Sequence, residues 1–155
     1  AGVTINAVFG FGEEYGWRGV LADALAPLGE FRATVLTGVL WGLWHAPIIV
    51  LGHNYGTEWG WGIPAMVAMT VPFSFILSWS RRRTGSVLAP SVLHGTFNAL
   101  LGIFALLVVG GHPAIALPAG LVLSVTLTVV ALALPRLRDS PVATVAPLTE
   151  AEQSS

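Results

Sequence analysis

Apolar residues occur along the chain in long runs, which short segments rich in glycine, proline or charged residues separate. A helix needs about 20 such residues to cross the hydrocarbon layer of a bilayer. Runs of roughly this length occupy residues 4–26, 31–51, 62–80, 86–109 and 114–134. We therefore predict an all-α fold, a polytopic bundle of about five transmembrane helices.

The segments between the runs support these boundaries. Pro27 closes the first run, and residues 53–61 form a polar loop with aromatic residues of the kind found at the headgroup boundary. Pro90 stands near the start of the fourth run, where a helix tolerates proline because the first turn leaves its N–H groups unpaired. We predict a membrane core over residues 1–138, followed by a disordered polar tail over residues 139–155.

Composition strengthens the membrane assignment. Hydrophobic residues make up 54% of the chain and charged residues 10%, with a mean hydropathy of +0.76. That leaves too little polar surface to cover a water-soluble globule. The net charge of -1 comes without a basic patch, so we expect no binding to nucleic acid. The chain has no cysteine, which excludes thiolate metal ligands and cysteine nucleophiles from it.

The arginines indicate an orientation. If the five helices alternate in direction, one side of the membrane receives every arginine except Arg18, and the other side receives His53, Glu58 and His112. Loops rich in arginine and lysine are typically cytoplasmic. We therefore expect an integral, multi-pass membrane protein whose arginine-rich helix ends face the cytoplasm.

Charged residues inside the first run need a separate explanation. Glu13, Glu14 and Arg18 lie in a segment of otherwise apolar or small residues. An ionisable group at membrane depth costs about 2.5–3.5 kcal/mol on insertion scales and is functional by default. Glu14 and Arg18 are four residues apart, so a helix places them as a pair that neutralises itself. Glu13 lies about 100° further round, free to face a polar interior.

Two other runs carry polar side chains into the membrane. His45 lies in the second run, while His94 and Asn98 share one face of the fourth because they are four residues apart. Polar groups in lipid must face one another or a water-filled cavity, so we expect the three helices to bring these residues together inside the bundle. Small residues that would permit such close packing are Gly10, Gly12, Gly16, Gly42 and Gly95.

A carboxylate, two imidazoles and an amide can hydrolyse an amide bond in two ways. In the first, Glu13 takes a proton from water as general base and His45 orients that water. His94 and Asn98 then donate hydrogen bonds to the oxyanion. In the second, His45, His94 and Glu13 bind a zinc ion with water as its fourth ligand. The residue types leave both mechanisms open.

A proton relay is a rival function for these buried residues. Asn98 argues against it, because an amide does not titrate.

The ordered motifs resemble those of the CPBP family of membrane proteins, which includes CAAX proteases and bacteriocin-processing (Abi) proteins. The resemblance rests on Glu13-Glu14-x-x-x-Arg18, on an aromatic residue four positions before His45, and on His94-x-x-x-Asn98. It covers residues 8–100 and implies an all-helical intramembrane endopeptidase. Glu13 and His45 would activate water, and the third motif would stabilise the oxyanion. The substrate would be a membrane-associated peptide or protein in the lipid bilayer, and the family pattern leaves a zinc or a metal-free mechanism open.

Two features depart from this family pattern. Trp41 occupies the aromatic position where phenylalanine is common, and we expect it to preserve the aromatic wall. Family members usually carry further transmembrane helices before the acidic motif, so we expect the chain to need upstream helices for activity. The alternative function on the same fold is non-proteolytic, either bacteriocin immunity or a membrane scaffold that binds a partner.

Overall fold

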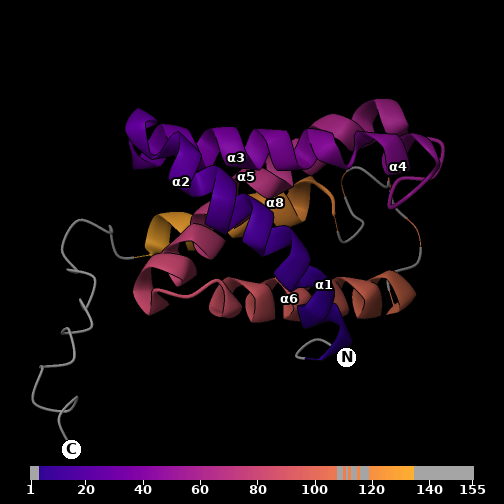
Figure 1. Ribbon diagram of the computed structural model, residues 1–155. Coiled ribbons are helices and arrows are strands. Elements are labelled where there is room, and N and C mark those ends of the chain that lie inside the picture. The colour runs from indigo at the N-terminus through magenta and orange to yellow at the C-terminus, as the bar shows by residue number, and fades with distance from the viewer. Residues whose placement is uncertain (1–3, 108–109, 111, 113–114, 116–118, 135–155) are drawn as a thin grey trace, which may run out of the picture.

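The computed structural model describes residues 4–107, 110, 112, 115 and 119–134. All the regular structure in these residues is helical (Figure 1), which confirms the predicted all-α bundle. The predicted polar tail, residues 139–155, lies outside the described residues.

Each of the five predicted runs contains a helix. The helices are α1 (Ile5–Glu14), α2 (Ala22–Leu25), α3 (Glu30–Trp44), α4 (Ala46–Val50), α5 (Trp59–Thr84), α6 (Leu88–Leu107) and α8 (Leu121–Ala133). A π-helical segment, Tyr15–Leu21, joins α1 to α2, so the first run forms one continuous helical rod. The rod ends in a 3-10 turn, Ala26–Leu28, and at Gly29, whose φ of 80° is a conformation that glycine adopts more readily than other residues.

Some helix ends differ from the predicted boundaries. The second run is broken at His45, because Pro47 has no N–H to continue the helical ladder, and α4 begins at the next residue, Ala46. Helix α5 begins at Trp59, inside the predicted polar loop, and continues past residue 80 through the arginines to Thr84. The prediction for Pro90 is confirmed, since it lies in the first turn of α6.

Within the part of the chain that the structure describes, three helical segments are long and apolar enough to cross a membrane by themselves: Glu30–Val50, Trp59–Thr84 and Leu88–Leu107. The first rod carries two glutamates, an arginine and an aspartate, and α8 has 13 residues, so neither belongs to that set. The three long segments make the chain an integral membrane protein.

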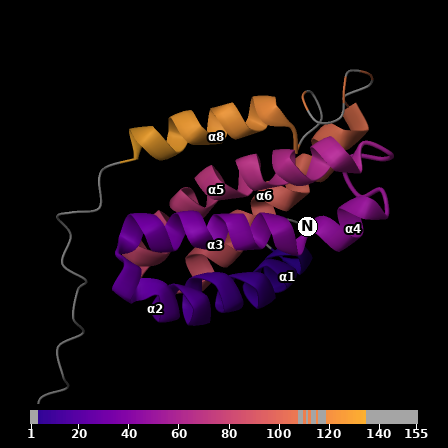
Figure 2. The ribbon, with the colours of Figure 1, turned by 90° about the horizontal axis from the view of Figure 1, so that it is seen from above.

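Helix α5 lies at the centre of the bundle, between α3 and α8, while α1 packs against α6 (Figure 2). Glycines permit these close approaches between helices because they have no side chain. A Cβ atom on Gly42 would lie 2.7 Å from the Cα atom of Val67 in α5, and one on Gly95 would lie 2.5 Å from the backbone nitrogen of Ala7 in α1. The predicted close packing is therefore confirmed at Gly10, Gly42 and Gly95, but it is wrong for Gly12 and Gly16, which face open space.

Charged residues mark the two ends of the bundle. At one end, Arg82 Nη2 lies 2.8 Å from Glu30 Oε1. At the other, His112 Nε2 lies 3.7 Å from Glu58 Oε2. The arginine-rich ends and the predicted opposite end are thus separated in the part of the chain that the structure describes. Which of them is cytoplasmic stays a prediction.

Candidate active site

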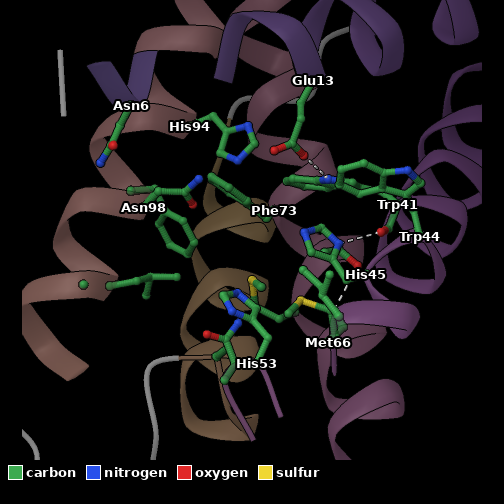
Figure 3. A pocket seen from close by; sticks show the side chains of 18 of the residues that line it. Asn6, Glu13, Trp41, Trp44, His45, His53, Met66, Phe73, His94 and Asn98 are labelled. Carbon is green, nitrogen blue, oxygen red and sulfur yellow. Dashed lines mark hydrogen bonds between the residues drawn. The ribbon is translucent and has the colours of Figure 1, made fainter. Parts of the chain in front are cut away.

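A cavity of about 610 Å³ lies inside the bundle among α1, α3, α5 and α6. Figure 3 shows the side chains of Glu13, His45, His94 and Asn98 turned toward it from three separate helical segments. The structure therefore brings together the four residues that the sequence marks for hydrolysis. Apolar side chains cover much of the remaining wall: Met66, Met69, Phe73, Phe97 and Leu101.

Glu14 and Arg18 lie behind this cavity and form a buried ion pair. Their exposed fractions are 0% and 2%. Arg18 Nη1 donates to Glu14 Oε1 at 2.9 Å, and Nη2 donates to Ser74 Oγ of α5 at 2.7 Å. The predicted pair forms even though the backbone after Glu14 is π-helical, a distortion found mostly at functional sites. The pair ties the first rod to the central helix.

His94 connects this ion pair to the cavity. Its Nδ1 lies 3.0 Å from Glu14 Oε1. A carboxylate oxygen accepts hydrogen bonds, so Nδ1 carries a proton and donates, and Nε2 is the ring nitrogen left for the cavity. Asn98 follows one turn later on α6 and also lines the cavity, as its spacing predicts.

His45 occupies the break between α3 and α4. Its Nδ1 lies 2.8 Å from the backbone oxygen of Trp41, one helical turn earlier. Because a carbonyl oxygen only accepts, Nδ1 is the donor, and a neutral His45 ring keeps the Nε2 lone pair free. The helix break caused by Pro47 therefore places an acceptor nitrogen at the cavity wall.

Glu13 accepts a hydrogen bond that the sequence reasoning missed. The indole Nε1 of Trp41 donates to Glu13 Oε2 at 2.8 Å. We expected Trp41 to form an aromatic wall, and it does contact Phe73 and His94 through its ring. The sequence did contain a signal for this hydrogen bond, because tryptophan carries an N–H that phenylalanine lacks.

Other polar residues of the site also escaped the sequence reasoning. Asn6 lines the cavity seven residues before Glu13, so helical periodicity alone places both on one face of α1. Ser74 holds Arg18, but serine in an apolar helix usually bonds its own backbone, which gives no signal of a long-range contact. His53 and Asn54 line the cavity from the loop after α4, at the end opposite the arginines.

The zinc alternative finds no ready-made ligand set. Among residues 4–107, 110, 112, 115 and 119–134, no three histidine, aspartate or glutamate side chains lie close enough together to hold a metal ion. The expected set of His45, His94 and Glu13 thus does not meet the geometry of a tetrahedral site in this conformation. Dependence on zinc stays a prediction, which a cleavage assay with a zinc chelator tests.

Comparisons with known proteins identify relatives. A family model described as type II CAAX prenyl endopeptidase Rce1-like matches residues 1–100. The chain is 30% identical over 94 residues to CAAX prenyl protease 2 of Methanococcus maripaludis, an alignment that covers 56% of this chain and 34% of that relative. The chain therefore matches about a third of the length of this curated relative. No solved structure matches the chain.

Proposed function

The chain belongs to the family of Rce1-like type II CAAX prenyl endopeptidases, and from that premise we propose that it forms the catalytic core of an intramembrane endopeptidase. Its substrate is a membrane-associated peptide or protein, and its nucleophile is a water molecule activated by Glu13 and His45. The observation that carries the proposal is the convergence of Glu13, His45, His94 and Asn98 on one cavity inside the bundle.

The first step uses the two groups beside Trp41. The free lone pair on His45 Nε2 accepts a hydrogen bond from water and orients it, while the Glu13 carboxylate takes the other proton. The water oxygen then forms a bond to the carbonyl carbon of the substrate. The electron pair of the carbonyl moves to its oxygen, which gives a tetrahedral oxyanion.

His94 and Asn98 stabilise that oxyanion. Donation from His94 Nε2 requires a proton there, and Glu14 at 3.0 Å from Nδ1 is the counter-charge for such an imidazolium. With His94 protonated, the negative charges of Glu13 and Glu14 balance the positive charges of Arg18 and His94. Transfer of a proton to Glu13 moves one negative charge onto the oxyanion, so the net charge inside the membrane stays constant.

Collapse of the intermediate completes the reaction. The carbonyl re-forms, the C–N bond breaks, and the proton held by Glu13 passes to the leaving amine nitrogen. The carboxylate is thereby regenerated, and the products are a carboxylic acid and an amine.

The cavity extends from the catalytic residues to His53 and Asn54, which supports entry of the peptide from the end opposite the arginines. We propose that the arginine-rich end is cytoplasmic.

The test is a cleavage assay on the protein expressed from its complete gene, purified in detergent and offered a library of membrane-proximal peptides. Glu13→Gln keeps the size and the acceptor oxygen but removes the base, so we expect kcat to fall by about 10²–10⁴. Glu58→Gln is the matched control, because this carboxylate lies in the loop before α5, outside the cavity, with a side chain that is 44% exposed.

Chelation separates the two mechanisms. Activity that is lost in Glu13→Gln and kept with a zinc chelator supports the metal-free step. If the chelator removes the activity and added zinc restores it, the result supports a zinc-assisted step in place of the metal-free one. A folded protein that cleaves no peptide under any condition would refute the enzymatic proposal and favour a binding or immunity role.

A further inference from the structure

We propose that Trp41 is a positioning residue for the catalytic carboxylate: its indole N–H holds Glu13 so that one carboxylate oxygen faces the cavity. The inference rests on the proposed function, because it gives a part in the same reaction to a residue that the chemical steps do not use.

The contact between the two side chains is short and sheltered. Trp41 Nε1 donates to Glu13 Oε2 at 2.8 Å, and Trp41 as a whole is 2% exposed. This is the one hydrogen bond to the Glu13 carboxylate among the described residues. The terminal torsion of a glutamate is broad and nearly two-fold, so without a fixed donor the carboxylate rotates freely. A buried donor on Oε2 leaves Oε1 to the cavity.

The indole is itself held from several sides. The guanidinium of Arg18 lies over the ring, with Cζ 4.5 Å from its centroid. Phe73 stacks on it at 5.8 Å with an interplanar angle of 27°, and the His94 ring meets it edge-on at 5.2 Å. A cation over an aromatic face and close ring contacts both restrict the plane. The buried ion pair behind the cavity therefore fixes the base through this indole.

Trp41 also contacts the other water-activating group. Its backbone oxygen accepts a hydrogen bond from His45 Nδ1 at 2.8 Å, while its side chain donates to Glu13. One residue thus sets the placement of the general base relative to the imidazole that orients the water. The side-chain contact is separable by mutation, because phenylalanine at this position keeps an aromatic plane and the backbone oxygen but donates nothing to a carboxylate.

The kinetic test compares three tryptophan variants in the assay described above. In Trp41→Phe we expect kcat to fall about 10- to 100-fold while KM changes less than about threefold, because substrate binding does not use the indole N–H. Benzothienylalanine at position 41 keeps the bicyclic shape and lacks only the N–H, so it should show the same loss even if the phenylalanine variant misfolds. Trp79→Phe is the control, since the indole nitrogen of Trp79 has no hydrogen-bond partner among the described residues and Trp79 does not line the cavity.

A spectroscopic test does not depend on activity. In protein labelled with ¹⁵N at the indole, the Trp41 N–H cross-peak is assigned by its loss in Trp41→Phe. We expect this cross-peak to shift when Glu13→Gln replaces the charged acceptor, and to stay in place in Glu58→Gln.

The outcomes separate the two proposals. If Glu13→Gln abolishes cleavage but both Trp41 variants keep kcat within about twofold of wild type, the positioning role is wrong and the proposed function stands. A rise in KM at constant kcat would also overturn it, because the indole would then bind substrate. If Glu13→Gln retains activity, the proposed function fails, and a Glu13-dependent shift of the indole cross-peak would still report the contact.

Discussion

Replacing Arg18 with methionine tests whether the buried ion pair holds the bundle together. Arg18 is 2% exposed and contacts three side chains: the carboxylate of Glu14 at 2.9 Å, the hydroxyl of Ser74 at 2.7 Å and the face of the Trp41 ring. Methionine keeps most of the apolar stem and removes the charge. Glu14, with no exposed surface, would keep His94 as its remaining partner among the residues that the structure describes.

The expected loss follows from these contacts. Removing one partner of a buried ion pair costs about 3–5 kcal/mol, because the other charge stays buried and uncompensated. His94 still bonds the carboxylate, which reduces the cost. The lost stacking on Trp41 raises it by about 1–2 kcal/mol. These two corrections oppose each other, so we expect Arg18→Met to lower the free energy of unfolding by about 3–5 kcal/mol.

The assay is unfolding by SDS titration in mixed micelles, followed by circular dichroism. Arg82→Met is the matched control, since the Arg82–Glu30 bridge has side chains that are 34% and 48% exposed and should contribute at most about 1 kcal/mol. Adding Glu14→Gln to Arg18→Met should cost less than the sum of the single changes, because the two residues are in contact. The reasoning is refuted if Arg18→Met is no less stable than Arg82→Met.

Three further changes test the packing, the oxyanion site and the loop. Gly95→Ala places a methyl group 2.5 Å from the backbone of α1 and should cost about 1–3 kcal/mol in the same SDS titration, whereas Gly12→Ala, which meets open space, should stay within about 1 kcal/mol of wild type. Asn98→Ala should lower kcat about 10²-fold with KM little changed in steady-state assays, and an unchanged kcat would remove Asn98 from the oxyanion site. Tyr55→Phe deletes the buried hydrogen bond from the phenol to the Ala119 carbonyl at 2.6 Å, so added protease should cut loop 51–58 faster, and an unaltered rate of cutting would contradict this anchoring role.

The sequence predicted the fold well because the bilayer imposes a length and a composition on each helix. The five runs all contain helices, and the spacing of Glu14 with Arg18 and of His94 with Asn98 placed each pair on one helical face. The predicted helix boundaries were less accurate. Trp59 and the arginines after residue 80 are helical despite their polarity, since a helix satisfies its own backbone groups beyond the hydrocarbon layer as well as within it.

By itself, the sequence determined that the chain enters the membrane, which residues are polar at depth, and which of them share a helical face, because hydropathy and helical periodicity are local properties. Only the tertiary structure decided that Trp41 donates to Glu13, that Ser74 of α5 holds Arg18, and that Gly12 faces open space while Gly95 faces α1. Such contacts join residues far apart in the chain. They depend on how each helix is rotated against its neighbours, which the packing of the whole bundle sets and no local pattern encodes.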